Sequence, residues 1–221
     1  GRVLKFADVG TEWISDADVQ DQLISVGRGW ELHTEKDTVE TYSANGRLLS
    51  ISDSKGNTQT LSYRGSVLTG VFSNSNEELA FSYDRSGNLV TVDFWASNPD
   101  PAQDQGRQWA YDYTNGNLSS VTNPDGSTRA YHYEDIYNPR SLTGITDERG
   151  IRYASWEYDL FGYATSSYHG TGAERVDVVY GLDGERTATD SHGNISAFGA
   201  TAQLGTGLVT DTQGATCANG D

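Results

Sequence analysis

The sequence predicts an all-β fold of repeated antiparallel β-hairpins, which form a curved sheet or one segment of a spiralling shell. Tyr, Thr and Val, separated by regular Gly, are typical of strands and turns, and the 221 residues include 25 Gly and 13 Tyr. Tyrosines end strand-like runs about every 21 residues. No stretch has the apolar period of an amphipathic helix, so we expect less than about 10% helix.

The strand-like runs end at Tyr42, Tyr63, Tyr83, Tyr113, Tyr133, Tyr158 and Tyr180. A bulky residue stands two positions before all but the first of these, where Glu40 is the exception. Because residues i and i−2 lie on the same side of a strand, one face should collect these side chains. We expect that face to hold Tyr63, Phe81, Tyr83, Tyr111, Tyr131, Tyr133, Trp156, Tyr158 and Val178.

A turn follows each tyrosine. Four copies read Tyr-x-x-x-Gly and end at Gly46, Gly87, Gly162 and Gly184, whereas "YTNG" is one residue shorter and ends at Gly116. The next strand carries Leu-x-x-Ile/Val, in the pairs Leu48 and Ile51, Leu68 and Val71, Leu89 and Val92, Leu118 and Val121, and Leu142 and Ile145. A spacing of three does not fit one face of a regular strand. Either the leucine belongs to the turn or a β-bulge intervenes.

A second turn reads "DSKGN" at 53–57, "NPDGS" at 123–127, "DERGI" at 147–151 and "DSHGN" at 190–194. Gly56, Gly126 and Gly150 should take positive φ there. Turn, strand, turn and strand make one hairpin of about 20 residues, and a lone hairpin is marginally stable in water. Neighbouring hairpins must therefore pack against one another.

These units, such as "YDRSGNLVTV" (83–92) and "GNLSSVTNPDGSTRAYHY" (116–133), resemble the YD repeats of Rhs proteins, of teneurins and of the C component of bacterial toxin complexes. The resemblance divides the chain into an irregular lead-in at 1–38, repeats at 39–194 with an inserted loop at 95–106, and a degenerate repeat or continuation at 195–221. The "DPxG"-type self-cleaving signature common in Rhs proteins is not present.

The resemblance implies a hollow shell that works without catalysis. Such a shell encapsulates or presents a toxin or another polypeptide, as in bacterial polymorphic toxins, and is secreted or lies on the cell surface. Its implied partners are further repeats of the same polypeptide, together with an enclosed toxin domain or a surface glycan. A cell-surface adhesion or carbohydrate-binding module is the alternative function, and an enzyme acting on polysaccharide is the third.

The net charge and the composition limit the kinds of partner that the chain can bind. The formal net charge is −16, so phosphates repel the chain, and we expect neither nucleic-acid binding nor membrane insertion. A calcium-binding surface or a basic partner would also fit this charge. The one cysteine, Cys217, has no internal partner. The chain starts at "GRVLKF" and ends at "CANGD", which we interpret as a piece of a longer protein.

The histidines and carboxylates that could bind a metal or act in catalysis do not have the sequence spacing that these functions require. We predict no catalytic, cofactor-binding or metal-binding residue, because His33, His132, His169 and His192 have no metal spacing. The neighbouring carboxylates Glu134/Asp135 and Asp183/Glu185 cannot flank a sugar bond from within one turn. The loop 98–106 offers Asn98, Asp100 and Asp104 to calcium without the EF-hand pattern. Trp95 and Trp109 are the aromatic residues most expected to be exposed.

Overall fold

The computed structural model describes residues 4–10, 13–15, 17–96, 106–181, 184–203 and 206–213, with side chains up to Gly199. The strands are β1 (Phe6–Asp8), β2 (Trp13–Ser15), β3 (Gln22–Val26), β4 (Gly29–His33), β5 (Thr38–Tyr42), β6 (Leu48–Asp53), β7 (Thr58–Arg64), β8 (Val67–Ser73), β9 (Glu78–Tyr83), β10 (Leu89–Trp95), β11 (Arg107–Thr114), β12 (Asn117–Thr122), β13 (Thr128–His132), β14 (Gly144–Thr146), β15 (Arg152–Tyr158), β16 (Ala164–His169), β17 (Ala173–Tyr180), β18 (Glu185–Thr189), β19 (Ile195–Gln203) and β20 (Thr206–Gln213). These ranges contain no helix, which confirms the all-β prediction. A helix that could cross a membrane is accordingly not found among them.

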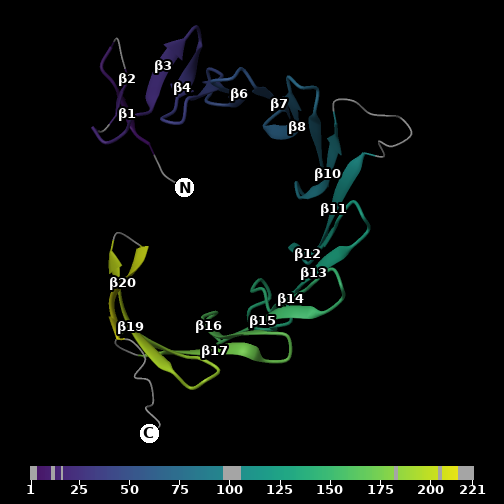
Figure 1. Ribbon diagram of the computed structural model, residues 1–221, viewed down its shortest axis with the longest axis vertical. Coiled ribbons are helices and arrows are strands. Elements are labelled where there is room, and N and C mark those ends of the chain that lie inside the picture. The colour runs from purple at the N-terminus through teal and green to yellow at the C-terminus, as the bar shows by residue number, and fades with distance from the viewer. Residues whose placement is uncertain are drawn as a thin grey trace. The chain divides into compact units, whose positions relative to one another are not determined.

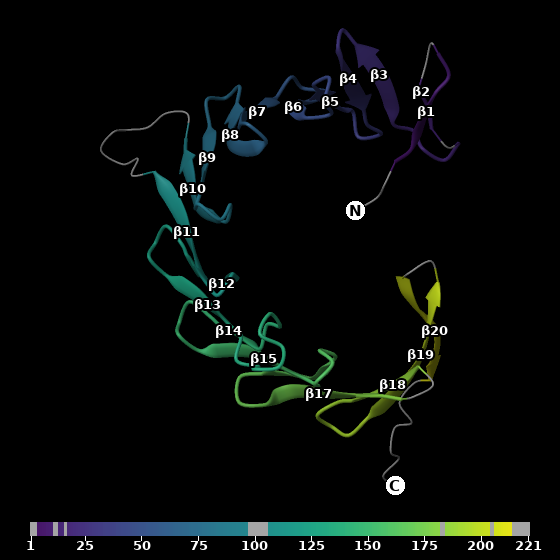
Figure 2. The ribbon, with the colours of Figure 1, turned by 180° about the vertical axis from the view of Figure 1, so that it is seen from behind.

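The strands belong to two compact units, residues 1–110 and 111–221. In the first unit β1 pairs with β2, and the strands from β3 to β11 pair in chain order. In the second unit the strands from β12 to β20 do the same. All of these pairs are antiparallel, so each strand lies beside its neighbours in sequence, as Figures 1 and 2 show from opposite sides.

One five-residue turn, which we call the repeat turn, recurs throughout both units. The N–H of its first residue donates to the carbonyl of its fifth, and the N–H of its fourth donates to the carbonyl of its first. Among the described residues it begins at Thr34, Ser43, Asp53, Ser73, Asp84, Asn123, Asp147, Asp159, Gly181 and Asp190. The two turn types that the sequence suggested are therefore the same structure.

The fourth residue of the repeat turn has positive φ. Gly56, Gly126 and Gly150 have φ of 84°, 82° and 77°, as expected for the second-turn glycines. Asp37 and Asn76 stand at this position in the turns that begin at Thr34 and Ser73, with φ of 57° and 62°. Asp and Asn tolerate the left-handed region better than other non-glycine residues. A search for glycine alone therefore misses these two copies.

The shorter turn "YTNG" is a two-residue hairpin loop between β11 and β12. Asn115 and Gly116 have φ of 53° and 80°, the backbone that a type I′ turn requires at both central positions. Gly65, with φ of 61°, supports a comparably short reversal between β7 and β8, where Arg64 pairs with Val67. Repeat turns and two-residue loops together set the register of the hairpins.

A β-bulge explains the Leu-x-x-Ile/Val spacing in three of the five pairs. Tyr42 pairs with Leu48 while Thr41 pairs with Ser50, so one residue, Leu49, is extra on β6. The same shift occurs where Tyr63 pairs with Leu68 and where Tyr83 pairs with Leu89. The extra residue returns the leucine and the later Ile or Val to one face.

Of the other two pairs, one differs clearly from this pattern. Leu118 and Val121 both lie within β12, as the bulged leucines lie within their strands. The unshifted register of Val121 with Arg129 concerns the following strand, and a bulge would lie beside the preceding tyrosine strand. Leu142 precedes β14 and lies in the connecting loop, while Ile145 lies in the strand itself. The five copies in the sequence are therefore not five copies of one local structure.

The bulky residues gather on one face within each unit, because directly opposed residues of an antiparallel pair lie on the same side. In the first unit this apolar face comprises Leu61, Val71, Leu79, Phe81, Val92, Phe94 and Trp109. In the second unit it comprises Val121, Tyr131, Ile145, Ala154, Trp156, Val176, Val178 and Ala188. Charged residues also stand in these rows. Glu40 lies opposite Leu32 and Ile51, and Arg107 lies opposite Phe94. In the second unit Arg129 lies opposite Val121, and Arg186 lies opposite Tyr180.

The described residues have almost no buried apolar core. Ala154, at 5% exposure, is their one buried hydrophobic residue, and no large side chain among them is fully buried. The members of the apolar face are half-buried by their neighbours in the sheet. Each unit is thus a single layer, whereas independently stable domains bury such a face against a second layer.

Replacing Gly126 by Val should destabilise the chain by about 1–2 kcal/mol, because a β-branched residue is strained at a φ of 82°. The measurement is the free energy of unfolding in urea. Gly126→Asn is the matched control, because Asn76 already takes this conformation at the equivalent position. Equal stability of the Val variant and the unmodified chain would contradict the described turn.

Candidate functional site

The motif aspartate caps the backbone of the repeat turn. In the copy that begins at Asp84, one carboxylate oxygen accepts the N–H groups of Ser86 at 2.8 Å and Asn88 at 2.9 Å. The other oxygen accepts the side-chain amide of Asn88 at 2.9 Å. The copies that begin at Asp53 and Asp190 make the same three bonds. The Asp-x-x-Gly-Asn pattern is therefore a closed hydrogen-bonding unit.

These bonds favour the ionised carboxylate. The side-chain amide of Asn88, followed by its backbone N–H, lowers the pKa of Asp84 below the usual value. Asn57 and Asn194 lower the pKa of Asp53 and Asp190 in the same way. In the turn that begins at Asp147, the side chain of Arg149 is the main cause of the lowered carboxyl pKa.

Three of the repeat tyrosines donate a hydrogen bond to a backbone carbonyl that precedes them by 15 or 16 residues. The Tyr63 hydroxyl donates to the carbonyl of Leu48 at 2.8 Å, and the Tyr158 hydroxyl donates to that of Leu142 at 2.7 Å. Tyr180 bonds the carbonyl of Ala164 in the same manner, at 2.8 Å. Burial, aided by the charge of Asp135, raises the pKa of Tyr158. The tyrosine thus satisfies a carbonyl that lies next to a bulge or loop.

Glu40 and Tyr42 form a variant of this arrangement at the start of the repeats. The Tyr42 hydroxyl donates to the Glu40 carboxylate, which lies two residues before it on the same face of β5. Burial, followed by the hydrogen bond to Glu40 and its negative charge, raises the pKa of Tyr42 to about 12. Glu40, which stands among the apolar residues of the first unit, therefore has a hydrogen-bond partner in Tyr42.

A polar network crosses three strands of the second unit. The Arg152 guanidinium donates to the Glu134 carboxylate at 2.9 Å and to the Thr143 carbonyl at 3.0 Å. It lies where a side chain on Gly144 would stand, so a larger residue there would displace the guanidinium. The hydrogen bond from Arg152 is the main cause of the lowered pKa of Glu134. The His132 imidazole contacts the Thr146 hydroxyl at 2.7 Å.

Thr146, His132 and Glu134 include the residue types of a nucleophile, a base and an orienting carboxylate, but not the required geometry. The Glu134 oxygen is 3.8 Å from the imidazole nitrogen, too far for a hydrogen bond, and the carboxylate is bonded to Arg152 and Thr143. These contacts cross-link β13, β14 and β15. The distances and partners of these side chains therefore support a structural role for the network rather than a catalytic one.

A second arginine cluster stands on the neighbouring strands. Arg175 donates to Asp177 at 2.9 Å and to Glu157 at 3.3 Å, and its guanidinium lies 5.2 Å from the centre of the Tyr168 ring. Its partners come from β15, β16 and β17. Both arginine clusters use the acidic residues of the chain to connect adjacent strands, rather than leaving them for an ion or a substrate.

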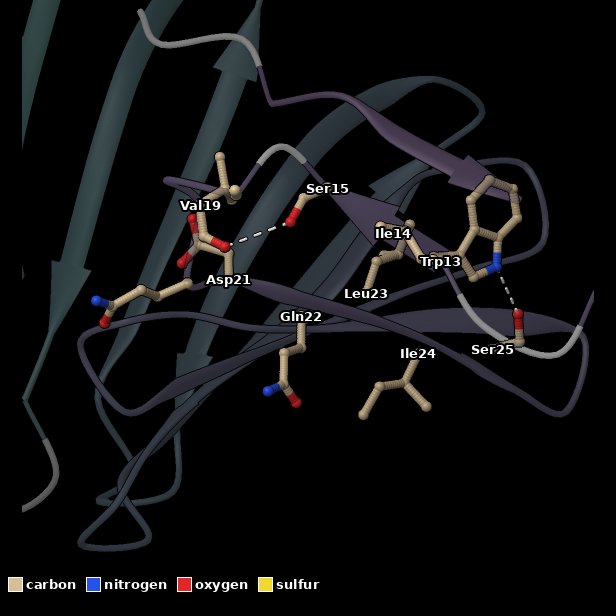
Figure 3. Close-up of a pocket in the computed structure, with 11 residues that line it drawn as sticks. Trp13, Ile14, Ser15, Val19, Asp21, Gln22, Leu23, Ile24 and Ser25 are labelled. Carbon is tan, nitrogen blue, oxygen red and sulfur yellow. Dashed lines mark hydrogen bonds between the residues drawn. The ribbon is translucent and has the colours of Figure 1, made fainter. Parts of the chain in front are cut away.

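A groove of about 940 Å³ lies between β2 and β3 of the first unit. Figure 3 shows Trp13 at one end, its indole N–H bonded to Ser25 at 3.0 Å. At the other end the Ser15 hydroxyl donates to the Val19 carbonyl at 3.3 Å. The Asp21 carboxylate, the one ionisable group among the described residues that line the groove, accepts the N–H of Glu35 at 2.8 Å. The groove offers apolar and amide surface and no acid–base pair.

The remaining candidate residues do not come together. Asp135 caps its own loop by accepting the N–H groups of Tyr137 and Asn138, while Trp95 is exposed and Trp109 is half-buried opposite Val92. Within the described ranges no group of three or more His, Cys, Asp and Glu is arranged to hold a metal. Asn98, Asp100, Asp104, Asp183 and Cys217 lie outside those ranges, so the calcium loop remains a hypothesis.

No protein-family model matches the sequence, and no curated protein is similar to it. Among solved structures, the Photorhabdus luminescens Tc holotoxin pore with a TccC3 mutation is 14% identical, with a TM-score of 0.46, over 83% of this chain and 12% of that chain. The crystal structure of TcdB2-TccC3-TEV is 16% identical, with a TM-score of 0.30, over 79% of this chain and 12% of that chain. A porin-like protein from Bacteroides uniformis ATCC 8492 is 13% identical, with a TM-score of 0.36, over 87% of this chain and 91% of that chain.

The chain thus spans about one eighth of the length of the first two of these chains, since it covers 12% of each. These identities and TM-scores carry no argument about activity or partners. The function is therefore inferred from the repeat itself.

Replacing Tyr158 by Phe should lower the free energy of unfolding by about 0.5–1.5 kcal/mol, because the Leu142 carbonyl loses its partner. Urea denaturation measures this change. Tyr137→Phe is the control, because Tyr137 is exposed and loses little with its hydroxyl. If both substitutions cost the same, the hydroxyl of Tyr158 does not join the hairpins.

Acid should weaken the fold through the repeat turns. The pKa values of Asp53, Asp84, Asp147 and Asp190 are lowered on folding, so their contribution is present above the unfolded value of about 4 and is lost as the pH falls through the lowered values. Urea midpoints at neutral pH and near pH 2.5 measure the loss.

The variant Asp53→Asn, Asp84→Asn, Asp190→Asn should lose less stability on acidification than the unmodified chain. Asparagine keeps an acceptor for the turn N–H groups but does not titrate. Identical pH profiles for the variant and the unmodified chain would show that these carboxylates do not cause the acid sensitivity.

Proposed function

We propose that this chain is a segment of an Rhs/YD-repeat shell that works without catalysis and encloses or presents another polypeptide. The observation that carries this proposal is a single-layer sheet of repeated hairpins whose apolar face has no cover among the described residues. The glycines, tyrosines and leucines of the repeat are proposed to be structural, in the turns, the tyrosine bonds and the bulges. The limits of the repeat region, 39–194, remain part of this proposal.

The alternation along the strands supports the proposal that another surface covers the apolar face. Trp156 and Val178 lie on that face, while their neighbours Glu157 and Asp177 lie on the opposite side. A half-buried row of aromatic and aliphatic side chains gains free energy when another surface removes it from water. Further repeats of the same polypeptide, or an enclosed polypeptide, would provide that surface.

The polar contacts support a structural role over catalysis. Arg152 and Arg175 each hold carboxylates on adjacent strands, and the repeat-turn aspartates hold backbone N–H groups. Side chains committed in this way are poor acids, bases or nucleophiles unless substrate displaces their partners. Secretion, or a position on the bacterial cell surface, is proposed from the family resemblance alone.

A carbohydrate-binding module is the second candidate, and the groove of Figure 3 is the observation in its favour. Trp13 offers a flat ring, and Gln20 and Gln22 offer amide groups, the combination that suits a sugar. The indole N–H is already bonded to Ser25, so only the ring would be available for stacking.

The shell proposal predicts that the isolated 221-residue chain binds an apolar dye such as anilinonaphthalene sulfonate and self-associates in light scattering. Trp156→Ser, on the apolar face, should reduce dye fluorescence. Val179→Ser, on the opposite face and in β17, is the control and should leave it nearly unchanged. A compact monomer that binds no dye would show a self-contained β-domain instead, and the shell proposal would fail.

A further inference from the structure

Two loops of the second unit expose four large apolar side chains at one place. Ile136 and Tyr137, between β13 and β14, are 81% and 69% exposed. Leu160 and Phe161, in the repeat turn between β15 and β16, are 69% and 86% exposed. We call these four residues the apolar edge. Tyr163, also exposed, follows the turn, and its ring lies 5.1 Å from that of Tyr180.

The repeat turn does not need apolar residues at these positions. Leu160 and Phe161 are the second and third residues of their turn, and both side chains are exposed. Eight other turns carry polar or small residues or proline there: Glu35–Lys36, Ala44–Asn45, Ser54–Lys55, Asn74–Ser75, Arg85–Ser86, Pro124–Asp125, Glu148–Arg149 and Ser191–His192. In the sequence, the turn that begins at Gly181 has Leu182 and Asp183 at these positions. Folding of the turn therefore does not explain Leu160 and Phe161.

Hydrogen bonds hold the two loops together. The Asn138 side-chain amide donates to the Asp159 carbonyl at 2.8 Å and to the Asp135 carboxylate at 3.0 Å. Asp135 in turn accepts the N–H of Tyr137 at 2.8 Å. The backbone beneath the four side chains is thus fixed before any partner arrives, which lowers the entropy cost of binding.

We propose that the apolar edge is a docking surface for a partner protein that offers an apolar groove with a basic rim. Exposed apolar side chains on a preformed support, with no role in the turn, mark an interaction site. Asp135 and Asp159 lie beside the edge, and the chain carries a net charge of −16, so a cationic rim complements it. This inference does not depend on encapsulation.

Other occupants fit the edge less well. A sugar stacks on flat rings, whereas half of the edge is the aliphatic pair Ile136 and Leu160. A second copy would add another charge of −16, and an anionic membrane would repel the chain. Protein interface cores, by contrast, combine aromatic and aliphatic side chains with few charges.

The test uses the full chain and a fluorescently labelled amphipathic helical peptide of Leu and Lys, with binding followed by anisotropy. The Leu/Lys peptide should bind, and a Leu/Glu peptide of the same pattern should bind at least tenfold more weakly. Leu160→Ser with Phe161→Ser should weaken Leu/Lys binding at least tenfold and leave the melting temperature unchanged, because Ser occurs at these positions in other repeat turns.

A transplant gives the matched control. Arg85→Leu with Ser86→Phe places the same pair in the equivalent turn of the first unit, with no partner loop like that of Ile136 and Tyr137. Added to the Ser double variant, it should not restore binding. If the transplant fully restored peptide binding, any exposed Leu–Phe turn would bind the peptide non-specifically, and the proposed site would be overturned.

Three further outcomes would overturn the proposal. Equal peptide binding by the unmodified chain and the Ser double variant would place binding elsewhere, for example on the apolar face. Binding of phosphatidylcholine vesicles that depends on Leu160 and Phe161, without peptide binding, would identify a membrane contact. Self-association that these two substitutions abolish would identify a second copy as the occupant.

Discussion

The fold depends on one local constraint. In eight of the ten repeat turns named above, a side-chain oxygen of the first residue accepts backbone N–H groups of the residues that follow it in the turn. Five residues contain the whole arrangement, as in Asp84 to Asn88. The turn fixes which residues oppose each other, and the bulge beside it returns the leucine to the face of its tyrosine. The tyrosine hydroxyl then satisfies a carbonyl of the previous hairpin. Because the described chain has almost no buried core, these local bonds carry more of the stability than they would in a two-layer domain.

Much of this architecture could be predicted from the sequence, because period-2 faces and turn residues are local signals. The hairpins, the antiparallel order and the glycine conformations follow from them. The spacing of Leu48 and Ile51 left two explanations open, since a bulge depends on the partner strand, which no single strand specifies. The glycine pattern does not identify the turns that begin at Thr34 and Ser73, because Asp37 and Asn76 replace glycine there. Their signal was Ser or Thr followed three residues later by Asp or Asn.

The functional surfaces were harder to predict, because exposure is a property of neighbouring strands. The sequence singled out Glu134 and His132 as chemical candidates, yet it could not show that Arg152 lies over Gly144 and bonds Glu134. It likewise favoured Trp95 and Trp109 for exposure, while the most exposed apolar side chains are Phe161 and Ile136. A usable signal existed, since Leu160 and Phe161 are both large and apolar, whereas none of the other repeat turns has two such residues at these positions in the sequence.

The self-contained repeat turn also determines how the length of such a protein can change. Since the two backbone hydrogen bonds that define it stay within five residues, a turn should keep its geometry when a neighbouring hairpin is gained or lost. A single strand cannot be removed in this way, because antiparallel pairing would then reverse the direction of everything that follows. Genetic insertion or deletion is therefore tolerated in whole hairpins of about 20 residues, and recombination between copies is a route by which chains of this kind grow or shorten.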